Sequence, residues 1–389
     1  MAAVAIVYLF LDFHLQVTRF YDDRFIFPYR DKPKGGFPGK GGFIKKNGWK
    51  WLTVGAILVL IAVYLLRSEL RKSGFRWPVF VATLEGVQWP WLLAATGMSL
   101  ATYYGRALRW AVLLKPLRPR PDMRKLVSAT VIGFTAATLL GRAGEFVRPY
   151  LIARQEGVPF SSQLAAWVLE RIYDLLMVLA IFGFALSRLR NLSNPGPTLA
   201  WVLEIGGWLV WVLSAASLLM LVMIRRYSEA MRQRLMDALG FLSQHHLDRA
   251  SRFLQALVQG AESTRSTKSV ILLLLYTLLE WALIAGCYMC ISMAFGTALQ
   301  FTVGDALTFI GFVSFGAVVQ FPGIGGGMQV VAVLVLTKIF GVSVELATSI
   351  AVLIWLITSV AIVPFGLVAA LHDGLTWRKL RELEREAAQ

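Results

Sequence analysis

The stretch Leu126–Pro149, LVSATVIGFTAATLLGRAGEFVRP, starts as an apolar run and then breaks at glycine and proline. Its apolar part, Leu126–Leu140, has 15 residues. As a helix it would cover about 22 Å, less than the ~30 Å hydrocarbon core of a bilayer. Gly and Pro interrupt the helical hydrogen bonds, and such backbone is tolerated at membrane depth only inside protein or beside a water-filled cavity. We therefore expect a re-entrant or broken helical hairpin here.

A second stretch has the same design. Ala306–Gln320 is also an apolar run of 15 residues, and the sequence FPGIGGG follows it at 321–327. A constant shift of 184 positions places Gly141 on Gly325, Glu145 on Gln329 and Gly157-Val158 on Gly341-Val342. Each Gly-Val pair leads into a long apolar run. The pattern predicts an inverted repeat with its ligand site at the two interruptions, the alternative being chance similarity among Gly-rich apolar segments.

Composition places these two hairpins in a membrane protein. Apolar residues make up 57% of the 389 residues and charged residues only 16%, whereas about a quarter of an average soluble domain is charged. We expect an all-α integral membrane protein with two hairpins and about six full transmembrane helices, at Trp49–Leu66, Trp91–Leu114, Leu164–Leu186, Leu199–Ile224, Val270–Phe295 and Val344–Leu371.

The chain divides by composition into three parts. Residues 1–48 form a leader whose end is rich in Gly, Lys and Pro, residues 49–371 form the membrane domain, and residues 372–389 form a charged tail. The halves of the membrane domain are expected at about 91–224 and 269–371, joined by residues 225–268. This connection mixes apolar and basic residues at helical spacing, which is typical of amphipathic helices lying on a membrane surface.

The formal net charge of +16 comes mostly from basic residues at the ends of apolar runs. Such residues set orientation and contact anionic headgroups, and no basic surface of the size needed to bind nucleic acid is left. The segment Arg106–Lys125 has seven basic residues and one acid. Placing it in the cytoplasm puts both termini there too, although the four basic residues of Arg67–Arg76 then lie outside.

Charged residues gather around the first interruption and in the run that follows it. They are Arg142, Glu145, Arg148, Glu170, Arg171 and Asp174. Charges inside a membrane usually pair or line a polar path, and a guanidinium binds either a carboxylate or a phosphate through paired hydrogen bonds. The cluster predicts a cavity for an anionic headgroup. The alternative is a salt-bridge network that only holds the hairpin to the next span.

Other charged and polar residues carry a weaker signal. Arg106 and Arg109 end an apolar run beside Trp110, which is typical of side chains that extend to the membrane interface. Glu280 and Lys338 are single charges in apolar runs without an obvious partner. The glycines at 325–327 allow the backbone to approach a ligand closely. The exposed N–H groups of the half-helix that follows could then face an anion. The sequence contains no recognisable catalytic or metal-binding motif, so we expect neither an enzyme nor a cofactor.

These residues resemble the flippase-like family that includes the transmembrane half of lysylphosphatidylglycerol synthases. The similarity lies in LGRAGEFVRPYLIAR at 140–154, in Gly157-Val158, in LERIYD at 169–174, in Ala107-Leu-Arg-Trp110, and in the Pro322-Gly323 hairpin with Gly341-Val342. Two positions depart from the family pattern. Gly141 replaces a usual proline, and Gln329 replaces a usual acid, which puts proton or cation coupling at that position in doubt.

The resemblance implies movement of a lipid or lipid-linked headgroup between leaflets. We expect a translocase of the plasma membrane that binds an anionic lipid and moves it between leaflets by alternating access. Its cavity would be formed by the cluster of charged residues and, from the other half, by Pro322, Gly323, Gly325 and Gln329. Partners would be membrane lipids, a lipid-modifying synthase or a second copy of the chain. The alternatives are a secondary carrier of a small soluble anion and a membrane-embedded glycosyl or lipid transferase. The aminoacyl-transferring domain of bifunctional members has no counterpart in the 18 residues after Leu371.

Overall fold

A computed structural model describes residues 75–190, 203–222, 255, 266–317, 320–321 and 325–374. Contacts divide the chain into two units, one of which is Arg76–Thr376. Its elements are α3 (Trp77–Glu85), α4 (Trp89–Leu114), α5 (Met123–Leu140), η1 (Gly141–Phe146), α6 (Val147–Glu156), α7 (Phe160–Arg190), α10 (Thr267–Ala294), η3 (Gly296–Ala298), α11 (Val303–Gly316), β1 (Gln320–Phe321), β2 (Gly325–Gly326), α12 (Gly327–Lys338), α13 (Val344–Trp355), η4 (Leu356–Val360) and α14 (Val363–His372). The leader 1–48, the expected span Trp49–Leu66, most of 225–268 and the tail after Gly374 lie outside the described residues.

The described residues include five helices that are long and apolar enough to cross a membrane: Met123–Leu140, Phe160–Leu189, Leu203–Val222, Thr267–Ala294 and Val344–His372. Four of them coincide with expected spans, which confirms the helical fold class. One further span was expected in this part of the chain, at Trp91–Leu114. The helix α4 covers it and has 26 residues, but it carries Arg106 and Arg109 and is not among these five. Met123–Leu140 is the exception, because it belongs to the first expected hairpin.

The first interrupted segment folds into two antiparallel helices, α5 and α6, joined by the 3₁₀ helix η1. The helix α5 starts at Met123, three residues before the apolar run, because the Asp122 side chain accepts the Arg124 N–H at 2.9 Å and caps the first turn. Its 18 residues reach the length of a span, so the expected length of 15 was wrong. At the open end of the hairpin, the Asp122 N–H donates to Glu156 at 3.2 Å.

The second interrupted segment is also a hairpin, formed by α11 and α12. Thr302 and Asp305 cap α11 reciprocally, so this helix begins at Val303 and has 14 residues. At the tip, Gln320 pairs with Gly326 and Phe321 with Gly325 in a two-residue antiparallel ladder. The helices approach closely at Gly316, where an added Cβ would lie 2.6 Å from the Gly327 carbonyl oxygen. At the open end, the rings of Phe301 and Phe340 lie 5.0 Å apart.

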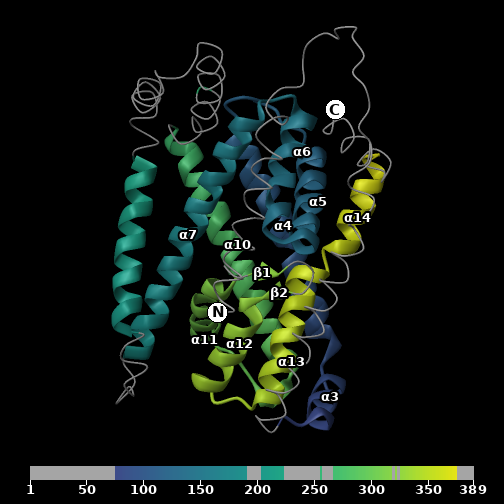
Figure 1. Ribbon diagram of the computed structural model, residues 1–389, viewed down its shortest axis with the longest axis vertical. Coiled ribbons are helices and arrows are strands. Elements are labelled where there is room, and N and C mark those ends of the chain that lie inside the picture. Colours follow the sequence, from purple (N-terminus) through teal and green to yellow (C-terminus); the bar gives the residue numbers. More distant parts are fainter. Residues whose placement is uncertain are drawn as a thin grey trace, which may run out of the picture. The chain divides into compact units, whose positions relative to one another are not determined.

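The two hairpins lie at opposite ends of this unit and meet at their tips. Figure 1 shows α5 and α6 in its upper half, α11 and α12 in its lower half, and the short β1–β2 ladder between them. The tip of the first hairpin, η1, contacts β1. Each hairpin ends at a glycine with a φ of 67°, Gly157 or Gly341, in the left-handed region. Each is followed by a long helical stretch, α7 or the series α13–η4–α14.

The buried apolar residues form two clusters that correspond to these two ends. One cluster is built on α4, α5, α6 and α7, with Trp110, Leu126 and Ile152 completely or almost completely buried. The other is built mainly on α10, α11, α12 and α13, with Phe309 and Ile350 at its centre. The helices α4 and α10 pack along each other and connect the two clusters. A cavity lies beside this helix pair, within reach of both hairpin tips.

Candidate functional site

Arg109 is the centre of a buried ion-pair network. Its side chain is 1% exposed, and its guanidinium lies 2.5 Å from Glu170 and 2.5 Å from Asp174, both on α7. It also lies 3.3 Å from Glu280 on α10 and donates to the Thr277 hydroxyl at 3.2 Å. The sequence expectation that Arg109 extends to the membrane interface was therefore wrong. The helix α4 continues past Arg109 to Leu114, which places the side chain between three helices instead of at a helix end.

Arg148, on the first turn of α6, forms the second part of the network. It donates to both oxygens of Glu170, at 3.1 and 3.0 Å, and to the Arg106 carbonyl oxygen at 3.0 Å. Its guanidinium carbon lies 4.2 Å from the centre of the Trp110 ring, a cation–π contact. Gly133 on α5 leaves room for Arg148 to pack against that helix, because a Cβ at Gly133 would collide with the Arg148 backbone and Cβ. The hairpin thus holds Arg148 against α4 and α7.

Arg106 and Arg171 complete the network and are more accessible than the other two arginines. The Arg106 guanidinium lies 2.7 Å from Glu280, and its side chain is 17% exposed. It also stacks on Phe134 of α5, with its guanidinium carbon 4.5 Å from the ring centre. Arg171 lies 3.2 Å from Asp174 and is 39% exposed. The network joins α4, α6, α7 and α10 and exposes two of its cations on one side.

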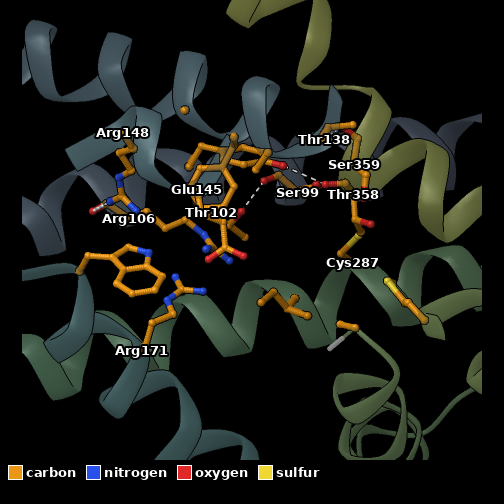
Figure 2. Close-up of a pocket in the computed structure, with 18 of the residues that line it drawn as sticks. Ser99, Thr102, Arg106, Thr138, Glu145, Arg148, Arg171, Cys287, Thr358 and Ser359 are labelled. Atoms are coloured by element: carbon orange, nitrogen blue, oxygen red, sulfur yellow. Dashed lines mark hydrogen bonds between the residues drawn. The ribbon is translucent and has the colours of Figure 1, made fainter. Parts of the chain in front are cut away.

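That side is a cavity of about 350 Å³, and Figure 2 shows that its two ends differ. Arg106, Arg148, Arg171 and Glu145 lie at one end, and Thr138, Thr358, Ser359 and Cys287 lie at the other. Apolar and aromatic side chains complete the lining, among them Phe134, Trp167, Ile284, Tyr288 and Met328. The cavity therefore has a cationic end and a weakly polar to apolar end.

The arginines at the cationic end have donors that no described acceptor uses. Among the described residues, the Nε atoms of Arg106, Arg148 and Arg171 are buried and have no hydrogen-bond partner. A buried donor without an acceptor costs free energy, on the order of 1–3 kcal/mol. The accessible parts of Arg106 and Arg171 suit an anion such as phosphate, since a guanidinium binds phosphate in a planar, bidentate arrangement. No group of three His, Cys, Asp or Glu residues placed to hold a metal ion occurs in the described part of the chain.

The weakly polar wall of the cavity includes a local π-helix. The segment η4 lies between α13 and α14 and widens the helical hydrogen-bond pattern, which leaves carbonyl groups without their usual partners. Side chains from two other helices bind these carbonyls: Ser99 donates to Ile357 at 3.1 Å, Tyr103 to Thr358 at 2.8 Å and Thr138 to Ser359 at 3.2 Å. The expected single span Val344–Leu371 is thus continuous but locally distorted beside the cavity.

The structure brings together part of the expected site. Glu145, Arg148 and Arg171 line the cavity, and Glu170 and Asp174 lie behind its wall and pair with Arg148 and Arg171. The side chain of Arg142, together with Pro322 and Gly323, lies outside the described residues. Gly325 belongs to the ladder at the tip of the second hairpin. The Gln329 amide oxygen accepts the Gly326 N–H at 2.7 Å, and its neighbour Met328 lines the cavity.

Sequence reasoning missed Arg106, Arg109 and Glu280. Glu280 was expected to have no obvious partner, yet its carboxylate lies against two arginines of α4. A signal was present in the sequence: an acid in the middle of a long apolar run needs a buried cation, and Arg106 and Arg109, three residues apart, share one face of a helix. The hydroxyls that contact η4 gave no signal, because Ser and Thr are common in membrane helices.

Comparison with known proteins agrees with this architecture. Residues 51–366 match the family model described as the lysylphosphatidylglycerol synthase TM region. Glycosyltransferase AglD of Haloferax volcanii is 26% identical over 137 residues, a match that covers 35% of this chain and only 21% of that relative's length. No solved structure matches the chain. Because the family match covers most of the chain, this protein is a multi-pass membrane protein that belongs to the family of the lysylphosphatidylglycerol synthase transmembrane region.

Proposed function

We propose that this protein is a membrane lipid translocase, which moves an anionic phospholipid or lipid-linked headgroup between leaflets without covalent chemistry. The observation that carries the proposal is the cavity whose one end is formed by Arg106, Arg148 and Arg171 and whose other end is weakly polar to apolar. An anionic headgroup would bind at the first end. The start of the acyl or polyprenyl chain would lie along the second.

The ion-pair network supports binding of an anion at this depth. Placing a charge in a membrane costs several kcal/mol unless oppositely charged groups surround it. Here Glu170 and Asp174 already hold the arginines in fixed positions. A headgroup therefore meets cations that need little rearrangement, which lowers the free-energy cost of binding.

The arrangement of the two hairpins supports transport by alternating access. We infer that the two halves, predicted at about 91–224 and 269–371, are inverted repeats. The elements α4 to α7 and α10 to α14 each consist of a long helix, an interrupted hairpin and a second long helical stretch. In such repeats the substrate site lies where interrupted segments meet, and motion of one half against the other exposes it to each side in turn. The proposed orientation has both termini in the cytoplasm and the protein in the plasma membrane.

A second candidate function is a membrane-embedded glycosyl or lipid transferase. The observation in its favour is the similarity to Glycosyltransferase AglD, although the chain covers about a fifth of that protein. A transferase would form a covalent product from an activated donor and a lipid acceptor. Incubation of the purified protein with labelled nucleotide sugars and a polyprenyl phosphate, followed by chromatography of the lipids, tests this candidate directly.

Reconstitution tests the translocase proposal. Proteoliposomes would contain fluorescent phospholipid or polyprenyl-phosphate analogues, and a membrane-impermeant quencher would report which leaflet holds them. We expect Arg171→Gln to reduce the rate about tenfold or more, because it removes a cation from the cavity wall. The matched control is Arg188→Gln on the same helix, since Arg188 is similarly exposed at 42% but pairs with Asp305 at the other end of α7.

Two results would contradict the proposal. One is that no anionic lipid crosses faster than in protein-free vesicles. The other is that Arg171→Gln and Arg188→Gln have equal effects, because the cationic end of the cavity would then have no special role. Transport of a soluble anion across the same vesicles, without lipid movement, would instead support a solute carrier.

A further inference from the structure

The acids around the cavity differ in their access to it. Glu170 has no exposed side-chain surface, and Glu280 is 2% exposed; both are held by arginines behind the cavity wall. Asp174, at 15%, lies between Arg109 and Arg171. None of these three lines the cavity, whereas Glu145 does. Figure 2 shows Glu145 at the cationic end, in the same region as Arg106, Arg148 and Arg171.

The charges of the network leave room for one more anion. Among the described side chains, four arginines form the network with three acids, Glu170, Asp174 and Glu280. Those pairs leave one positive charge without a matching acid, and Glu145 is the fourth carboxylate at this end of the cavity. Arg106, Arg148 and Arg171 line the same cavity. Among the described side chains, Glu145 is therefore the acid that balances the remaining positive charge of the network, and it does so from within the cavity.

We propose that the Glu145 carboxylate holds the anion position of the cavity in the absence of lipid and that a singly charged phosphodiester displaces it. This inference deepens the proposed function and rests on it for the identity of the ligand as a lipid headgroup. A carboxylate and a phosphodiester each carry one negative charge and offer oxygens that a guanidinium can bind in pairs. Among the described side chains, one bound anion therefore replaces another, and the four arginines of the network face the same number of bound negative charges in both states.

The local structure allows this exchange at Glu145 and opposes it at the other acids. Glu145 lies in η1, a 3₁₀ segment of six residues that begins at Gly141, where φ is 65°. Short 3₁₀ segments have weaker hydrogen bonds than α-helices and often lie at functional hinges. Moving Glu170 would break its contacts with both Arg109 and Arg148.

The exchange predicts opposite effects for two neutralising substitutions in the same cavity. Glu145→Gln removes the competing anion and should tighten phosphodiester binding about tenfold, whereas Arg171→Gln removes a ligand contact and should weaken it. The probe is dibutyl phosphate, added to the purified full-length protein in detergent. Binding is followed by tryptophan fluorescence, since Trp167 lines the cavity. Thermal unfolding of each variant establishes that it is folded.

A matched control and a second variant make the result decisive. Glu85→Gln removes the same charge from an exposed position at the end of α3 and should leave the dissociation constant within about twofold of the unmodified protein. Glu145→Asp retains the competing charge and should bind nearly as the unmodified protein does. Unchanged binding by Glu145→Gln overturns the exchange, because Glu145 would then have no effect on the ligand. Weaker binding also overturns it, because Glu145 would then contact the ligand directly.

Failure of this inference is distinguishable from failure of the proposed function. If the protein translocates anionic lipid and Arg171→Gln abolishes it, but Glu145→Gln does not tighten binding, the translocase stands and the exchange is wrong. If no lipid crosses in proteoliposomes while Glu145→Gln binds dibutyl phosphate more tightly, the exchange stands and the translocase is wrong.

Discussion

The half of the molecule from α4 to α7 contributes four arginines and two acids to the buried network, whereas the half from α10 to α14 contributes one acid, Glu280. The described lining residues of the second half are uncharged, among them Ile284, Met328 and Thr358, and η4 accepts hydrogen bonds from Ser99 and Thr138 of the first half. The order of the elements is nearly the same in both halves, but their chemistry is not. Among the described residues, the charged side chains that line the cavity all come from the half from α4 to α7.

This asymmetry is visible at the two hairpin tips. The first tip carries Glu145 at the cavity, whereas the corresponding position of the second carries Gln329, which caps the start of α12 through the Gly326 N–H. A neutral amide at that position leaves the charge balance to the first hairpin alone. In the proposed function, the charged residues of the first half would bind the headgroup, and uncharged residues of both halves would contact the rest of the ligand.

The largest expected effect comes from breaking the charged half at its centre. Arg109→Met leaves Glu170 and Asp174 without their shared partner, and removing one member of a buried ion pair costs about 3–5 kcal/mol. We expect either that much less folded protein is obtained or that its unfolding temperature falls by a large amount. Thermal unfolding in detergent measures this.

The control for this prediction is Arg76→Met. Arg76 pairs with Glu345 at 3.7 Å, but its side chain is 71% exposed, so the pair contributes about 0–1 kcal/mol. Equal losses for the two variants would show that the network at Arg109 does not stabilise the fold.

The sequence predicted the helical membrane fold and the two interrupted hairpins because apolar run length and Gly/Pro breaks are local properties. It located Glu145, Arg148 and Arg171 for the same reason, since charges near a break in an apolar run are unusual. It misjudged Arg109 because the partners of a buried charge come from distant helices. Glu170 and Glu280 are 61 and 171 positions from Arg109 along the chain. Such pairs depend on how α4, α7 and α10 pack.

An intermediate effect is expected from separating the two helices of the first hairpin. Gly133→Val places side-chain atoms where the Arg148 backbone and Cβ lie, and overpacking of this kind costs about 1–3 kcal/mol. Because Arg148 moves away from Glu170, lipid movement should fall more steeply than stability. Thermal unfolding and the proteoliposome assay measure the two effects.

Gly97→Val, on α4, is the matched control for Gly133→Val, since an added Cβ at Gly97 has no atom within 4 Å. It should leave both measurements nearly unchanged. If Gly133→Val is tolerated as well as Gly97→Val, then close packing of α5 on α6 does not position Arg148.

The smallest effect is expected at the weakly polar wall. Thr138→Val removes the hydroxyl that donates to the Ser359 carbonyl at 3.2 Å but keeps the shape of the side chain. A neutral hydrogen bond of this kind contributes about 0.5–1.5 kcal/mol, so stability should fall by less than in either preceding case. Binding of dibutyl phosphate should change less than about twofold, because its charge contacts the other end of the cavity. A loss of binding as large as that of Arg171→Gln would mean that the hydroxyl wall also contacts the anion, and the division of labour between the two ends would be wrong.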